Sequence, residues 1–190
     1  MRITLICGSV RECSYTKVLL KSLQKEIKRK FNTVEVDLVD LSETPLPIFD
    51  GSDINKKNAE IFIDRIDKAD GFIIASPEYH NSFSGVLKNA FDYLSSAQIK
   101  NKPIGIIAVS GGGKGGINCL NGMRTFLRGL NGLVLPDQVV VDNQYVINNH
   151  CVNEELLLRI KGLVEEVLNF SYLTGLKNEK PLNSQLYTFV

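Results

Sequence analysis

Residues 103–120 read PIGIIAVSGGGKGGINCL, and this stretch decides the fold class. The run 103–109 is almost entirely apolar, as is typical of a strand in a parallel sheet that is covered on both faces. Five glycines then stand among the six residues 111–116, and an apolar stripe at helical spacing runs from Leu120 to Leu130. A buried strand, a glycine loop and a helix in this order predict one unit of an α/β fold.

Outward from this stretch, apolar runs alternate with helical stripes along the whole chain. The other expected strands are residues 3–7, 34–38, 71–76 and 133–141, the last interrupted by Pro136. The other expected helices lie at residues 14–31, 59–66, 84–96 and 156–167. Strands and helices that alternate in this way predict an α/β, doubly wound parallel sheet with right-handed crossovers.

The length of 190 residues suits a single domain with a substantial core. The sequence shows no internal repeat and no composition shift that would mark a linker. We therefore expect one domain over residues 1–176, followed by a polar tail at residues 177–190.

Charge and cysteine content restrict the function classes. The formal net charge is +1, so we expect neither a nucleic acid nor a membrane as partner. The four cysteines form no C-x-x-C pair and only two histidines occur, so we expect no metal site. The sequence shows no signal peptide and no apolar segment of membrane length, and we expect a cytoplasmic protein.

The loop after the first strand has the residues of an anion site. In doubly wound sheets, ligands bind beyond the carboxyl ends of the strands. The segment GSVRECSYT (8–16) supplies the hydroxyls of Ser9, Ser14 and Thr16 and the guanidinium of Arg11 at the start of a helix, where backbone amides favour negative charge. An equally open interpretation is that Ser14 only caps the helix and Arg11 is a surface residue. The pattern G-x-x-x-x-G-K-[ST] is absent, which disfavours a triphosphate-binding loop.

The loop after the third strand, SPEYHNSFSG (76–85), places Tyr79 and His80 at the same edge of the sheet. His80 has no serine or cysteine nucleophile pattern beside it, so a hydrolase is disfavoured and we expect no catalytic side chain. A capped helix start with one exposed aromatic ring is the alternative interpretation of this loop.

The glycine loop formally contains the dinucleotide pattern G-x-G-x-x-G at Gly111, Gly113 and Gly116, with Asp137 at a plausible spacing for a ribose contact. That pattern normally follows the first strand of its unit, whereas these glycines follow the fourth. Glycines also let backbone amides approach a ligand closely. We therefore favour a flavin, with its phosphate on the loop after the first strand and its ring between the other two loops.

The three loop segments together resemble the NADPH-dependent FMN reductase family, which has a flavodoxin-like fold. The segments are GSVRECSYT, SPEYHNSFSGVLKNAFDYLS and VSGGGKGGINCLNGMRTFLRGL, and the last two also resemble bacterial azobenzene reductases. The similarity runs from residue 1 to about residue 170. It implies a five-stranded sheet of order 2-1-3-4-5 with helices on both faces.

The resemblance also implies a tightly but non-covalently bound FMN, with NADPH as reductant, and it carries over no catalytic residue. The residues implied for the phosphate are Ser9, Arg11, Ser14, Tyr15 and Thr16. Those implied for the isoalloxazine ring are Pro77, Glu78, Tyr79 and His80 on one side, and Ser110, Gly111, Gly112, Gly113, Lys114, Gly115 and Gly116 on the other. The role of Lys114 stays open between the NADPH phosphate, the reduced flavin and an acidic partner.

The expected reaction is a ping-pong transfer of hydride through FMN to a flavin, quinone or azo acceptor. The alternatives are a flavodoxin-like electron carrier without enzymatic activity and a redox sensor. A carrier needs an acidic docking surface, and the balance of 22 basic against 21 acidic residues disfavours it. The resemblance further implies a homodimer or homotetramer, and Phe83 and Tyr93 are candidates either for that interface or for the core.

Overall fold

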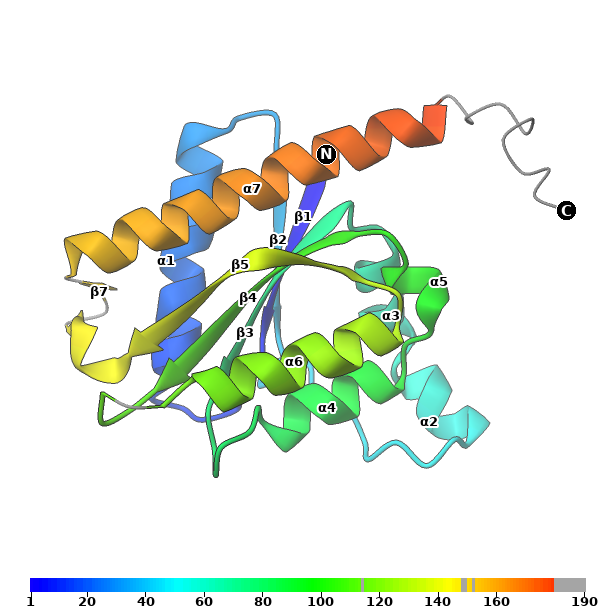
Figure 1. The fold of residues 1–190 in the computed structure, drawn as a ribbon. Coiled ribbons are helices and arrows are strands. Elements are labelled where there is room, and N and C mark those ends of the chain that lie inside the picture. Colours follow the sequence, from blue (N-terminus) through cyan, green and yellow to red (C-terminus); the bar gives the residue numbers. More distant parts are fainter. Residues whose placement is uncertain (114, 148–149, 152, 180–190) are drawn as a thin grey trace, which may run out of the picture.

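Five parallel strands form the centre of the protein (Figure 1). The structure is a computed structural model that describes residues 1–113, 115–147, 150–151 and 153–179. The strands are β1 (Arg2–Cys7), β2 (Glu35–Asp40), β3 (Gly71–Pro77), β4 (Pro103–Ser110) and β5 (Leu133–Asp142). Their order is β2-β1-β3-β4-β5, which confirms the expected flavodoxin-like topology.

Helices cover both faces of the sheet. They are α1 (Tyr15–Lys30), α2 (Asp53–Asn58), α3 (Glu60–Asp67), α4 (Gly85–Asp92), α5 (Ser96–Ile99), α6 (Ile117–Gly129) and α7 (Glu154–Glu179). Figure 1 shows α1 and α7 on one face, and α3, α4 and α6 on the other. The short elements η1 (Asn143–Tyr145), β6 (Val146–Ile147) and β7 (His150–Cys151) lie between β5 and α7. None of the helices in the described part of the chain combines the length and apolar character needed to cross a bilayer.

The continuous apolar runs of β3 and β4 are explained by burial on both faces, because every residue of these two strands is buried. Alternate side chains face opposite helix layers. Ile73 packs in the cluster that α1 and α7 cover, whereas Phe72 and Ile74 pack in the cluster beneath α3, α4 and α6. Each large side chain buried in this way contributes about 1.5–3 kcal/mol to folding.

The helix expected at residues 84–96 is confirmed as α4, but it ends at Asp92, and a second short helix, α5, begins at Ser96. Ser95 has an extended backbone, and its side chain accepts a hydrogen bond from the amide of Ala97 at 3.2 Å. The Gln98 side chain in turn accepts from the amide of Ser95 at 3.0 Å. This reciprocal capping box starts α5 just beyond the apolar stripe of α4.

Around Pro136, β5 continues as one strand, but its pairing with β4 is interrupted there, as expected. β5 lies at the edge of the sheet, where a residue without an amide hydrogen is tolerated. The pairing register with β4 shifts between Ile104 and Ile106, so the strand accommodates extra residues as a bulge. Asp137, the acid at dinucleotide spacing, is exposed within this strand rather than at its carboxyl end.

Tyr93 and Phe83 contribute to packing within this chain. Tyr93 is buried, its hydroxyl donates to the Pro47 carbonyl at 3.0 Å, and its ring meets Phe49 edge-on. Phe83 is half-buried, with its ring centroid 4.9 Å from that of Phe126. The sequence left open whether Phe83 and Tyr93 belong to an oligomer interface or to the core, and the structure supports packing within the chain.

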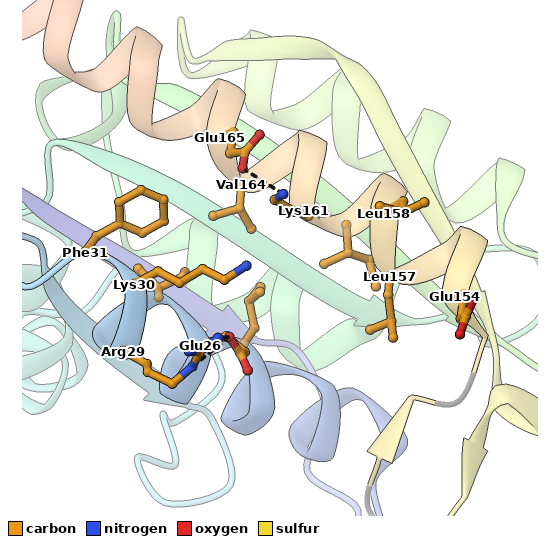
Figure 2. A pocket seen from close by; sticks show the side chains of 13 residues that line it. Glu26, Arg29, Lys30, Phe31, Glu154, Leu157, Leu158, Lys161, Val164 and Glu165 are labelled. Carbon is orange, nitrogen blue, oxygen red and sulfur yellow. Dashed lines mark hydrogen bonds and ion pairs between the residues drawn. The ribbon is translucent and has the colours of Figure 1, made fainter.

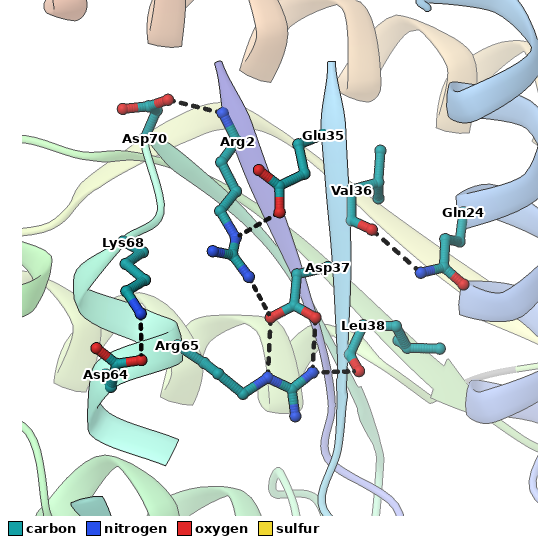
Figure 3. A network of polar contacts seen from close by, with 10 residues as sticks. All are labelled: Arg2, Gln24, Glu35, Val36, Asp37, Leu38, Asp64, Arg65, Lys68 and Asp70. Atoms are coloured by element: carbon teal, nitrogen blue, oxygen red, sulfur yellow. Dashed lines mark hydrogen bonds and ion pairs between the residues drawn. The ribbon is translucent and has the colours of Figure 1, made fainter. Parts of the chain in front are cut away.

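A network of charges fixes α3 to the outer strand β2 (Figure 3). Arg65 of α3 donates to both carboxylate oxygens of Asp37, at 2.9 and 2.7 Å, and also to the Leu38 carbonyl at 2.7 Å. Arg2 of β1 lies 3.5 Å from Asp37 on the other side. Burial would raise the pKa of Asp37, but Arg65 and Arg2 outweigh it and hold this pKa below its ordinary value of 3.8.

We predict that Arg65→Met lowers the free energy of unfolding at neutral pH by about 1–3 kcal/mol, because it leaves a largely buried carboxylate without its main partner. Since the pKa of Asp37 is depressed in the folded state, this stabilisation is present above about pH 4 and disappears as the pH falls through that pKa. The difference in free energy of unfolding between the wild type and Arg65→Met, measured by urea denaturation, should therefore become smaller below pH 4.

The matched control is Lys68→Met, which removes the exposed pair of Lys68 with Asp64 on the same helix. Exposed pairs of this kind contribute at most about 1 kcal/mol. Equal losses in the two variants would contradict the role given to Arg65.

Candidate functional site

The loops that follow β1, β3 and β4 meet at the carboxyl edge of the sheet, the edge where these parallel strands end. They line one pocket of about 100 Å³. Of the residues expected in the site, those that line it are Ser9, Arg11, Ser14, Tyr15, Thr16, Pro77, Glu78, Tyr79, Ser110 and Gly111. Cys13, Val109 and Asn143, which the sequence did not indicate, line it as well.

A larger cavity of about 510 Å³ lies between α1 and α7 (Figure 2). Its lining combines aliphatic side chains, such as Leu157 and Val164 on α7, with an equal number of charged ones, which include the pair of Lys161 and Glu165. It shares no lining residue with the pocket at the carboxyl edge. A cofactor site is distinguished by polar groups that converge on one point rather than by its volume. We therefore place the candidate site at the smaller pocket, at the carboxyl edge of the sheet, where polar groups of three loops meet.

The first loop combines buried hydroxyl groups with an exposed arginine. Ser9, Ser14 and Thr16 are buried, whereas Arg11 is exposed and lines the pocket. Ser14 caps α1 by accepting a hydrogen bond from the amide of Lys17 at 3.1 Å. A hydroxyl that accepts one hydrogen bond keeps its own proton for donation. The capping role of Ser14 is therefore compatible with a ligand contact.

A buried ion pair anchors the beginning of α1. The ammonium of Lys17 lies 2.8 Å from a carboxylate oxygen of Asp40, at the end of β2, and donates to Ser42 at 2.6 Å. Burial would raise the pKa of Asp40, but hydrogen bonds from Lys17 and Ser42 lower it below its usual value. Lys17 is thus engaged with β2, and Arg11 is the cation that the first loop presents to the pocket.

One serine connects the first loop to the second. The buried Ser84 hydroxyl donates to the Gly8 carbonyl and accepts from the amide of Leu87 at 3.2 Å, where it caps α4. The buried Ser76 hydroxyl of β3 accepts from the amide of Ser84 at 3.0 Å and so fixes the end of the second loop to its own strand.

His80 stands at the tip of a tight turn. Tyr79 and Ser82 exchange backbone hydrogen bonds of 2.8 and 3.0 Å around His80 and Asn81, which both have positive φ angles. His80 is exposed and does not line the pocket, whereas Tyr79 does. A contact of His80 with a bound ring stays a prediction.

The glycine loop has a backbone conformation that residues with a side chain rarely adopt. Gly112, Gly113 and Gly116 have φ angles of +85°, +71° and +102°. Gly111 lines the pocket, whereas Gly112, Gly113, Gly115 and Gly116 do not. Lys114, whose role was left open, lies outside the described residues.

Glu78 lines the pocket, yet its carboxylate is bonded to the start of α6. One oxygen accepts from the amide of Gly116 at 2.6 Å and the other from the amide of Cys119 at 3.3 Å. Gly116, which precedes α6, has no side chain to cap the helix. Glu78 therefore supplies from another loop the capping group that this helix lacks.

Asp142 is a residue of the site that the sequence interpretation missed. It ends β5, is buried, and accepts hydrogen bonds from the amides of Gly113 and Gln144. Its position at the carboxyl end of a strand beside the glycine loop was the available signal. An isolated acid in an apolar run carries no indication of which amide it binds.

The buried cysteines have no thiolate character. Burial raises the pKa of Cys7 to about 11 and that of Cys119 to about 12. Among the described residues, no group of three or more His, Cys, Asp or Glu side chains is arranged to hold a metal ion. The polar groups in and around the pocket are thus hydroxyls, backbone amides, the carboxamide of Asn143, the guanidinium of Arg11 and the bonded carboxylates of Glu78 and Asp142.

Fold and site together define a class: a flavodoxin-like protein with a polar cradle at the start of its first helix. The model of the family described as NADPH-dependent FMN reductase matches residues 1–146. The chain belongs to this family and is an oxidoreductase of that class, as the resemblance of its three loops indicated.

Proteins similar to this chain carry related descriptions. The NADPH azoreductase of Bacillus sp. (strain OY1-2) is 37% identical over 169 residues, which cover 88% of this chain and 90% of that protein. The FMN-dependent NADPH-azoreductase of Staphylococcus saprophyticus is 31% identical over 185 residues, covering 90% and 95%.

A solved structure supports the fold independently. The flavoenzyme NAD(P)H:(acceptor) oxidoreductase FerB from Paracoccus denitrificans superposes with a TM-score of 0.72 at 20% identity, over 90% of this chain and 97% of that one. At this level of identity the likeness establishes the flavodoxin-like arrangement alone.

Proposed function

We propose that this protein binds FMN non-covalently at the pocket of the carboxyl edge and uses it to oxidise NAD(P)H and reduce a small-molecule acceptor. When bound, FMN supplies the hydride and electron chemistry. The protein supplies a phosphate cradle, a position for the ring and the redox environment. The family assignment supports both the flavin and the pyridine nucleotide.

The observation that carries this proposal is the difference between the two helix N-termini at the site. The first turn of α1 contains no acidic residue, and Arg11 lines the pocket beside it. The N-terminus of α6 already binds the carboxylate of Glu78. A phosphate is therefore attracted to α1, whereas at α6 it meets a negative charge that is already in place. This arrangement disfavours the dinucleotide interpretation of the glycines, which requires a pyrophosphate at α6.

The described residues then divide into two groups. For the phosphate, the proposed contacts are the hydroxyls of Ser9, Ser14 and Thr16, the backbone around Tyr15, and the guanidinium of Arg11. For the ring, they are the loop around Pro77 and Tyr79 on one side, and Ser110 with Gly111 on the other. The proposal includes no side chain as a nucleophile or general base, because FMN carries the reacting atoms.

The proposed kinetic order is ping-pong, with NAD(P)H and the acceptor using the same open side of the pocket in turn. The proposed acceptors are free flavins, quinones or azo compounds, in accord with the azoreductases among the relatives. A flavodoxin-like carrier is disfavoured by the nearly equal numbers of acidic and basic residues and by the match to a reductase family.

We also propose a homodimer or homotetramer in the cytoplasm. The oligomer is supported by the large apolar side chains of Ile48, Ile54 and Ile61, which are 80%, 76% and 73% exposed. The location is supported by Cys7, Cys13 and Cys119, which are free thiols.

The direct test of the function is steady-state oxidation of NADPH by the purified, FMN-loaded protein with a flavin, a quinone and an azo dye as acceptors. We expect turnover with at least one acceptor, and parallel lines in double-reciprocal plots, as a ping-pong order requires. Negligible NADPH oxidation with every acceptor would contradict the proposal.

A second prediction concerns Arg11. Arg11→Ala should weaken FMN binding by roughly 1.5–3 kcal/mol, since it removes a charge-assisted hydrogen bond to the phosphate. Quenching of FMN fluorescence by flavin-free protein measures this affinity. Lys25→Ala removes an exposed cation from α1, the helix that follows the loop of Arg11, and is the matched control. Equal affinities of Arg11→Ala and wild type would reject Arg11 as a phosphate ligand.

A further inference from the structure

We propose that Glu78 and Asp142 are positioning residues that hold the glycine loop in the shape that accepts the flavin ring. The glycine loop here means Gly111–Gly113 together with Gly115 and Gly116. The inference rests on the proposed function. It assigns to these two carboxylates a role that acts through the backbone of the loop rather than through contact with the cofactor.

Both oxygens of Glu78 are committed to the protein itself. They receive the amides of Gly116 and Cys119, so the carboxylate closes the N-terminus of α6. The backbone of Glu78 is fixed as well, since its amide donates to the Val109 carbonyl at 2.8 Å. The second loop is thereby tied to β4 through its backbone and to the end of the glycine loop through its side chain.

Gly115 leaves the space that the carboxylate of Glu78 occupies. A Cβ atom added there would stand 2.3 Å from a carboxylate oxygen of Glu78 and 2.9 Å from the Cβ of Ser110. Gly115 therefore has an internal reason to be glycine: any side chain would displace Glu78 from α6. Gly116 has its own reason, since its φ angle is +102° and a Cβ would stand 2.5 Å from Val140.

Asp142 holds the other end of the loop. Its two oxygens receive the amides of Gly113 and Gln144, the second at 3.0 Å. Gly113 has a positive φ angle, which Asp142 stabilises through this bond. The loop is consequently fixed at Gly113 from β5 and at Gly116 from the second loop. Gly111, the member of the loop that lines the pocket, lies directly before these anchors.

Riboflavin has the same ring as FMN but no phosphate. Comparing the affinities for the two flavins therefore distinguishes a residue that binds the phosphate from a residue that positions the loop beside the ring. Flavin-free wild type, Glu78→Ala, Glu78→Gln and Asp142→Asn are titrated with each flavin by fluorescence, and their thermal unfolding is recorded without flavin. Asp137→Asn, an exposed carboxylate on the same strand as Asp142, is the matched control.

We expect Glu78→Ala to weaken the binding of FMN and riboflavin by the same factor, at least about tenfold, which corresponds to the loss of charge-assisted hydrogen bonds. Glu78→Gln should recover part of the loss, because its carbonyl oxygen accepts one of the two amides. Asp142→Asn should weaken both flavins to a smaller extent. Arg11→Ala, by contrast, should weaken FMN alone.

Gly115→Ala provides a test that keeps the charge of Glu78. It should weaken the binding of both flavins as Glu78→Ala does, since the new methyl group displaces the carboxylate of Glu78. In the Glu78→Ala background the same substitution should weaken flavin binding less than it does in the wild type, because only the contact of the new methyl group with Ser110 remains. Such non-additivity is the signature of two residues that act through one contact.

The outcomes separate this inference from the proposed function. Normal binding of both flavins by Glu78→Ala and Gly115→Ala would overturn the positioning role while leaving the flavin site intact. Additive effects of the two substitutions would overturn it as well. A wild-type protein that binds neither flavin would overturn the proposed function, and the inference with it.

Discussion

The parallel pairing of β1, β3 and β4 brings three loops that are distant in the sequence to one edge of the sheet. This pairing is stable because helices cover both faces, so β3 and β4 are buried along their whole length and β1 is buried after Arg2, with mostly apolar side chains. The hydroxyls, amides and charged groups of the site come from separate loops. The shared edge of the sheet places them around one pocket, and hydrogen bonds of Ser84, Glu78 and Asp142 then fix the loops.

At that edge, two helices begin with opposite electrostatic environments. α1 begins with buried hydroxyls beside Arg11, while Lys17 is engaged with Asp40. α6 begins with a glycine, and its amides are satisfied by Glu78. Both helix dipoles favour an anion, but one of them is already neutralised by the protein. The direction in which FMN would bind, with its phosphate at α1 and its ring towards the glycine loop, follows from this difference.

The buried parallel sheet was predictable because the apolar runs at residues 71–76 and 103–109 are long and uninterrupted, whereas the order of its strands was expected only from the resemblance to the reductase family. The end of α4 at Asp92 was missed because Leu94 extends the apolar stripe beyond it, although Ser95 and Gln98 have the spacing of a capping box. Pro136 marks a break in the pairing of β5, as expected, but the strand continues beyond it because it lies at an edge, and that position follows only from the completed sheet.

The pocket was predictable at the level of loops, while the pairing of individual groups was not. The sequence indicated Glu78 as a member of the site, but not that its carboxylate bonds to α6, because that contact spans two strand-to-helix connections. Asp142 lay outside every recognised segment. The glycines were interpreted as space for a ligand, whereas Gly115 and Gly116 are also required by Glu78 and Val140.

The central claim is that the three loops form a flavin site which accepts electrons from NADPH. The most direct measurement is the visible absorption spectrum of the purified protein after reconstitution with FMN and removal of free flavin, followed by anaerobic addition of NADPH. We predict a flavin spectrum that stays with the protein and bleaches when NADPH is added. A protein that retains no flavin absorbance, or a bound flavin that NADPH leaves oxidised, would contradict the account.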